Sequence, residues 1–349
     1  MTGLFRAPLL RARDGNWKHW NGQVFADFSR VDVSRLRHHA DVGVDIAQGR
    51  GALRAWADVQ RGQIVGGTAD LALADVNATL GAGLQALVLP SIQGRLGGRR
   101  LNGGFEFSTQ ALQFKTDDGL TWPGGNVRLV HTAAAGKAPA QGEFRADRLD
   151  LAALAQVASR LPLGATAHEA VRTYSPHGLV DEIQATWKGP LENLQQYQVR
   201  GRIRGLALAG DTPASASTQL GLRGATVDID MTQAGGKAAL TIASGALVLP
   251  GVFEDPVLPL DRLSADVRWQ LDGDRIAVQA TDVQFANADA QGEARATWHT
   301  SDAGKVAHRS RFPGVLDLTG TLNRADGTRV HRYLPLSIPQ ESRHYVRDA

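Results

Sequence analysis

The sequence predicts a mostly β protein, built on a long, strongly curved antiparallel β-sheet that forms a groove. Apolar and polar residues alternate over residues 263–271, and the alternation resumes over residues 276–280, after the turn sequence Asp-Gly-Asp at 272–274. Such alternation on both sides of an Asp-Gly turn is a strong signal for a β-hairpin. Strand-like segments recur about every 8 to 12 residues, the spacing of all-β proteins. So many strands exceed what one flat sheet holds, and accumulated twist is expected to curl the sheet.

The first part of the chain is expected to form one curved sheet unit over residues 23–162, after an irregular, polar segment at residues 1–22. Short helices are expected near residues 34–40 and 151–161. In the second of these, apolar residues recur at helical spacing until Pro162 stops the pattern. The pattern therefore predicts a run of strands that ends in a short helix.

A connector at residues 163–182 is expected to lead into a second β-sheet unit, residues 183–332, continuous with the first. Within it, Val283 and Phe285 fall on the opposite parity from Ile276 and Val278. A β-bulge inserts one residue and so reverses the parity of a strand, which predicts a bulge near residues 281–282. Residues 333–349 read as a truncated tail that enters a helix near Gln340.

The residue types argue against an enzyme. The chain has 349 residues and no cysteine, which excludes disulfides, a thiolate nucleophile and Cys-ligated metal. Its ten histidines form no His-x-x-x-His pair, and no nucleophile elbow, dinucleotide fingerprint or phosphate-binding loop occurs. Glycine pairs such as Gly97-Gly98 predict turns and bulges. We therefore expect no catalytic residue, no metal and no cofactor.

The charge pattern bears on whether the protein binds polyanions. The formal net charge is +3, and Arg200, Arg202 and Arg204 alternate along one predicted strand. Single-stranded nucleic acid favours aromatic residues interleaved with such a stripe, and that interleaving is missing, so no nucleic-acid partner is expected. A solvated outer sheet face and contact with anionic headgroups both stay open. No apolar run reaches the roughly 18 residues of a membrane-spanning helix, and no signal peptide is evident.

Several short segments together resemble one family. In their order and spacing they are similar to the AsmA-like proteins of Gram-negative bacteria, and specifically to the YhdP branch. The segments are RADRLDLAAL at 145–154, LPL at 161–163, YSPHG at 174–178, LVLPGVF at 247–253, LPLDRL at 258–263, FPGVLDL at 312–318 and VHRYLP at 330–335.

The resemblance implies a periplasmic protein that is tethered to the inner membrane by an N-terminal helix. Such proteins resemble bridge-like lipid transfer proteins, whose long curled β-sheet carries phospholipid acyl chains towards the outer membrane. The anchor is absent from this chain, which also ends where the family continues, so we expect a middle segment of a longer protein. Membrane contact would then depend on the missing parts. Phospholipid is the expected ligand, and no protein partner can be named.

Two functions follow from the predicted sheet. The first is a segment of a lipid-transport bridge, in which the apolar face holds acyl chains. The second is a structural or adhesive β-rich surface protein whose inward residues pack on one another and bind no ligand; the seven tryptophans fit ordinary core packing equally well. For the first function, parity predicts these groove-lining residues: Phe105, Phe107, Leu240, Ile242, Val267, Trp269, Leu271, Ile276, Val278, Val283, Phe285 and Trp298.

Overall fold

The structure is a computed structural model that describes residues 2–6, 21–38, 44–161, 165–190, 194–208, 221–301 and 314–348. Contacts between residues divide the chain into two compact units. The first unit comprises Met1–Val171 and Glu182–Tyr197, and the second comprises Arg172–Asp181 and Gln198–Ala349. Each unit is described separately below. The finer segment boundaries predicted from the sequence stay predictions.

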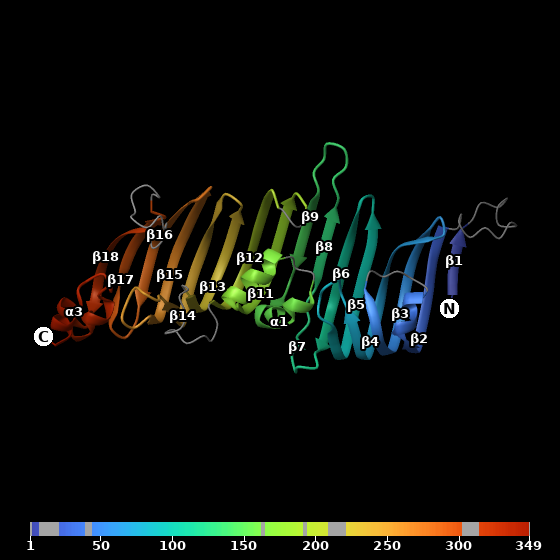
Figure 1. Cartoon of the computed structure of the whole chain (residues 1–349), viewed down its shortest axis with the longest axis horizontal. Helices are drawn as coiled ribbons and strands as arrows, with labels where there is room; N and C mark the ends of the chain where they lie inside the picture. Colours follow the sequence, from blue (N-terminus) through green and yellow to red (C-terminus); the bar gives the residue numbers. More distant parts are fainter. Residues whose placement is uncertain are drawn as a thin grey trace. The chain divides into compact units, whose positions relative to one another are not determined.

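The first unit is an antiparallel meander. Each of β2 to β6 pairs with the next strand, β8 pairs with β6, and β9 lies between β8 and β11 (Figure 1). The short β7 pairs with the end of β6, and β1 pairs with β2. The strands are β1 (Thr2–Arg6), β2 (Asn21–Asp32), β3 (Asp45–Gln60), β4 (Gln63–Thr79), β5 (Leu87–Leu101), β6 (Gly104–Lys115), β7 (Thr121–Trp122), β8 (Val127–Thr132), β9 (Gln141–Ala146), β10 (Leu149–Asp150) and β11 (His177–Lys188), of which the part from Glu182 onward belongs to this unit.

Short helices accompany this sheet. They are η3 (Val33–His38), α1 (Leu151–Val157), η4 (Ala158–Arg160) and α2 (Ala165–Tyr174). The side chain of Asp150 caps α1 by accepting a hydrogen bond of 3.0 Å from the backbone N–H of Ala153, which satisfies one free donor of the first turn. The predicted helices near 34–40 and 151–161 are thus present, the first as a 3₁₀ turn; residues 39 and 40 lie outside the described residues.

A small hydrophobic core closes one end of the first unit. Val76, Ala78, Leu87 and Leu89 are buried together, with partly buried neighbours that include Phe114. The ring of Phe114 stacks on Trp122, with centroids 5.5 Å apart and planes 8° from parallel. This end of the unit is therefore packed like an ordinary protein interior.

The second unit is also an antiparallel meander, in which each strand pairs with its sequence neighbours from β12 to β18. Its strands are β12 (Gln196–Leu208), β13 (Gly221–Thr232), β14 (Gly235–Val248), β15 (Val257–Asp272), β16 (Arg275–Ala286), β17 (Ala290–His299) and β18 (Val315–Ala325). They are followed by η5 (Gly327–Tyr333) and α3 (Gln340–Asp348), which matches the helix predicted near Gln340.

The mostly β, antiparallel fold predicted from the sequence is confirmed, and so is the hairpin. Asp272 pairs with Arg275 across a two-residue turn in which Gly273 has φ +54°. The predicted bulge is also present, because Asp282 has φ +52° and the register shifts beside it in both neighbouring pairs of strands.

Two local predictions were wrong. Residues 1–22 were expected to be irregular, but Thr2–Arg6 forms β1, because a short segment with few apolar residues can still pair its backbone with the edge of β2. Residues 7–20 lie outside the described residues. Gly97-Gly98 was expected to be a turn, but it lies inside β5. A Cβ atom at position 97 would lie 2.5 Å from the Ser108 hydroxyl, so the glycine leaves room for that side chain.

Candidate functional site

The registers of the second unit gather the predicted residues on one face of its sheet. Residues directly opposite each other in an antiparallel pair point to the same side. One such row runs through Gly236, Trp269, Val278, Trp298 and Leu316, on β14 to β18. Parallel rows place all ten predicted lining residues of this unit on the same face: Leu240, Ile242, Val267, Trp269, Leu271, Ile276, Val278, Val283, Phe285 and Trp298. We call this the apolar face of the second unit.

The bulge at Asp282 keeps this face continuous along β16. Val278 pairs with Trp298, and Phe285 pairs with Gly292, although the two β16 residues differ in parity. Without the extra residue, Val283 and Phe285 would point to the opposite face. The left-handed backbone of Asp282 therefore places the apolar residues before and after the bulge on the same face of β16.

Solvent exposure varies along the apolar face of the second unit. Ile242 is 1% exposed and Leu263 is also buried, so their end of the face is packed by the protein's own side chains. Trp269, Val278 and Phe285 are half-buried. At the β18 edge, Leu316, Leu318 and Leu322 are exposed, with Leu318 at 66%. The face is thus closed at one end and open to solvent at the other end and along β18.

The first unit has an equivalent apolar face that contains the two remaining predicted residues. Phe105 and Phe107 on β6 are each 40% exposed. Phe107 pairs with Leu129 on β8, which in turn pairs with Phe144 on β9. Sequence analysis missed Leu129 and Phe144 as members of this face, although the alternation within β8 and β9 is the signal that identifies them.

The opposite face of each sheet is polar and crossed by ion pairs. In the first unit, Arg95 donates hydrogen bonds of 2.5 and 2.9 Å to the two carboxylate oxygens of Asp70. These bonds hold the pKa of Asp70 below its ordinary value and raise the pKa of Arg95. Arg95 also lies over the ring of Trp56, 5.7 Å from its centroid. Trp56 therefore belongs to the polar face and not to the apolar one.

The predicted arginine stripe is part of the polar face of the second unit. Arg200 pairs with Asp230 at 3.2 Å, Arg202 with Asp228 at 3.6 Å, and Arg204 lies 2.5 Å from an oxygen of Asp181. The side chains of all three arginines stay more than half exposed. Each arginine thus has an acidic partner on its own sheet, which fits the solvated outer face better than a site for anionic headgroups.

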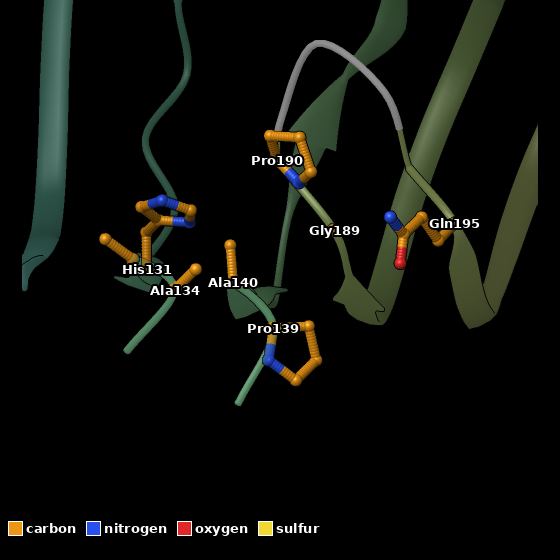
Figure 2. Close-up of a pocket in the computed structure, with 8 residues that line it drawn as sticks. His131, Ala134, Pro139, Ala140, Gly189, Pro190 and Gln195 are labelled. Atoms are coloured by element: carbon orange, nitrogen blue, oxygen red, sulfur yellow. The ribbon is translucent and has the colours of Figure 1, made fainter. Parts of the chain in front are cut away.

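One depression opens beside the apolar face of the first unit (Figure 2). It has a volume of about 370 Å³ and lies between the loop after β8 and the segment after β11. Its lining residues are His131, Ala133, Ala134, Pro139, Ala140, Gly189, Pro190 and Gln195. The backbone N–H of Gly189 donates a hydrogen bond of 2.7 Å to the carbonyl of Ala140, which ties the two segments together. His131 pairs with Phe105 and so belongs to the same face.

Among the described residues, no group of three or more His, Cys, Asp or Glu side chains is placed to hold a metal ion. Likewise, no helix within those residues is long and apolar enough to cross a membrane.

A family model described as YhdP protein matches residues 9–349, which is nearly the whole chain. No curated protein and no solved structure matches the chain.

Proposed function

The chain belongs to the YhdP family, and we propose that it is a segment of a periplasmic lipid-transport bridge. In this proposal the apolar faces of the sheets hold the acyl chains of phospholipids on their way between the inner and outer membranes.

The observation that carries the proposal is that each sheet has one apolar face and one polar face. In β14 to β17, aliphatic and aromatic side chains lie on one face, and they stay partly exposed over much of it. Soluble proteins seldom leave a large contiguous apolar patch open to water unless the patch binds something. An acyl chain suits such a surface, because it is long, flexible and apolar throughout.

The proposed mechanism is passive. Each methylene that leaves water for the apolar face contributes about 0.8 kcal/mol, and this gain does not depend on one exact position. A row of similar apolar side chains therefore offers many sites of nearly equal affinity, along which a chain can slide. The headgroup would stay in water at the edge of the face. No covalent step is required, which agrees with a lipid-transport family and with the absence of catalytic motifs from the sequence.

The predicted lining residues differ in whether an acyl chain can touch them. The partly exposed side chains, such as Trp269, Val278 and Phe285, are the ones that an acyl chain can touch directly. Ile242 is enclosed, and we propose that it supports the floor of the face instead.

Mass spectrometry of lipid bound to the purified protein tests the proposal. The double variant Val278→Glu, Phe285→Glu places two charges on the apolar face, and it should lose most of the bound phospholipid. The matched control is Gln279→Glu, Gln284→Glu, which adds the same charges to the polar face of the same strand and should keep the lipid. A wild-type protein that carries no phospholipid would favour the alternative, a structural protein with a self-packed core.

A further inference from the structure

Two polar atoms lie unpaired inside the apolar face of the first unit. Within the described part of the chain, neither Nδ1 of His131 nor Nε1 of Trp187 has a hydrogen-bond partner, and both atoms are shielded from solvent. Trp187 is only 8% exposed. An unsatisfied buried donor or acceptor costs about 1–3 kcal/mol, so a pair of them in one place calls for a partner.

The registers bring these two side chains close together. Phe105, His131, Gly142 and Trp187 form one row across β6, β8, β9 and β11. Gly142 has no side chain, and the indole of Trp187 fills the space over it, between β11 and His131. The His131 ring contacts Phe105, with centroids 5.7 Å apart. His131 and Trp187 thus place two polar atoms in a row that otherwise holds Phe105 and Gly142.

His131 also forms part of the wall of the depression described above. His131 and Gln195 lie on opposite sides of Ala140 (Figure 2), and small apolar residues and prolines make up most of the remaining wall. The depression therefore joins an apolar surface to His131, one of the two side chains with an unpaired polar atom. Its volume suits the polar end of a ligand and not a whole lipid.

We propose that this site binds the carbonyl end of a long acyl chain. The carbonyl oxygen would accept hydrogen bonds from the Trp187 indole N–H and from a ring N–H of His131, while the hydrocarbon lies along Phe105, Phe107 and Leu129. A carbonyl oxygen has two lone pairs and can accept both bonds. The chemistry is shared by a glycerol ester and by a free fatty acid. This inference rests on the proposed lipid-binding function and names the group that the site recognises.

The test uses two ligands that carry a ¹³C label at the acyl carbonyl, palmitate and dipalmitoyl phosphatidylglycerol in vesicles. Binding to the whole chain is followed by titration and by the ¹³C chemical shift, which moves downfield when the carbonyl accepts hydrogen bonds. Trp187→Phe keeps an aromatic ring but removes the indole N–H together with the five-membered ring that carries it, and His131→Phe keeps the contact with Phe105. Each should weaken binding roughly fivefold, the equivalent of one hydrogen bond, and reduce the downfield shift.

Trp122→Phe is the matched control, because it removes the same atoms from a tryptophan of the same unit that is 9% exposed and whose indole nitrogen is not among the buried unpaired atoms. It should bind both ligands as the wild type does. Losses with both ligands support the shared carbonyl site, a loss with palmitate alone assigns it to free fatty acid, and a loss with the phospholipid alone assigns it to the ester.

Two results would overturn the inference. If His131→Phe and folded Trp187→Phe both bind with unchanged affinity and an unchanged ¹³C chemical shift of the carbonyl, the proposed carbonyl site is wrong. The proposed lipid binding would not be affected by that result. A wild-type protein that takes up neither ligand would remove the proposed function together with this site. Circular dichroism of each variant establishes folding, and His131→Phe keeps the test decisive if Trp187→Phe does not fold.

Discussion

The indole ring of Trp187 on β11 lies directly over the backbone of Gly142, its cross-strand partner on β9. A Cβ atom at position 142 would fall inside the van der Waals surface of the indole. The same arrangement recurs in the second unit, where a Cβ at Gly236 would lie 2.6 Å from the indole of Trp269. A tryptophan paired with a glycine is thus a recurrent way of building the apolar faces.

Gly142→Ala should therefore destabilise the first unit by about 1–3 kcal/mol, because the added methyl forces the indole out of its place. Urea unfolding measures the change. Gly98→Ala is the control in the same unit, since nothing lies within 4 Å of a Cβ at that strand position. It should be neutral or slightly stabilising. Equal effects of the two substitutions would contradict the packing described.

A second prediction concerns the bulge at Asp282. Asp282 has φ +52°, a region that β-branched residues avoid at a cost of roughly 1–2 kcal/mol. Asp282→Val should lower the free energy of unfolding by about that amount, whereas Asp282→Gly should not. Gln279→Val, at an extended position on the polar face of the same strand, serves as the control. Thermal unfolding of the three variants distinguishes them, and a stable Asp282→Val would argue against the left-handed bulge.

The ion pair of Arg95 and Asp70 predicts a dependence on pH. The hydrogen bonds from Arg95 lower the folded-state pKa of Asp70, so the carboxylate stabilises the folded state at any pH above its unfolded pKa of about 4. This contribution should disappear as the pH falls from about 4 through the lower folded pKa. Asp70→Asn should flatten the stability curve below pH 4, as measured by urea unfolding. An unchanged slope would show that the pair does not affect stability.

The C-terminal segment is attached to the sheet by a buried network. The hydroxyl of Tyr333 donates a hydrogen bond of 2.9 Å to Asp289 and accepts one of 2.9 Å from Asn287. Burial raises the pKa of Tyr333, so the phenol stays protonated and remains a donor at neutral pH. Arg332 donates a hydrogen bond of 2.9 Å to the same carboxylate oxygen of Asp289.

Tyr333→Phe should cost about 1–3 kcal/mol, because it removes one of the donors to a buried carboxylate. It should also speed amide hydrogen exchange in residues 327–333. The control is Tyr345→Phe, because Tyr345 is 76% exposed and should tolerate the loss of its hydroxyl. Unaltered exchange in the first variant would mean that Tyr333 does not hold this segment.

Much of the second unit could be predicted from its sequence, because local patterns specify it. Alternation from Leu263 to Leu271 assigns a face to each residue, and the Asp-Gly turn sets the register of the next strand. The shift of parity after Val278 predicts the bulge at Asp282. The face of every predicted residue in this unit then follows from pairing alone.

Other features depend on contacts that no local pattern encodes. Gly97-Gly98 reads as a turn, but Ser108 on the neighbouring strand needs the space that a side chain at Gly97 would occupy. The depth of burial at Ile242 could not be predicted either, because it depends on neighbours from several strands. For the same reason His131 and Trp187 were missed: nothing in the sequence shows that Gly142 lies between them.

Site-specific photocrosslinking along β16 in living cells tests the central claim most directly. A photoreactive amino acid is placed in turn at positions 278, 279, 283, 284 and 285, and lipid adducts are measured by mass spectrometry. The account predicts phospholipid adducts at 278, 283 and 285 and none at 279 and 284, with the change of parity produced by the bulge at Asp282. Adducts at all five positions, or at none, would contradict a lipid-carrying apolar face.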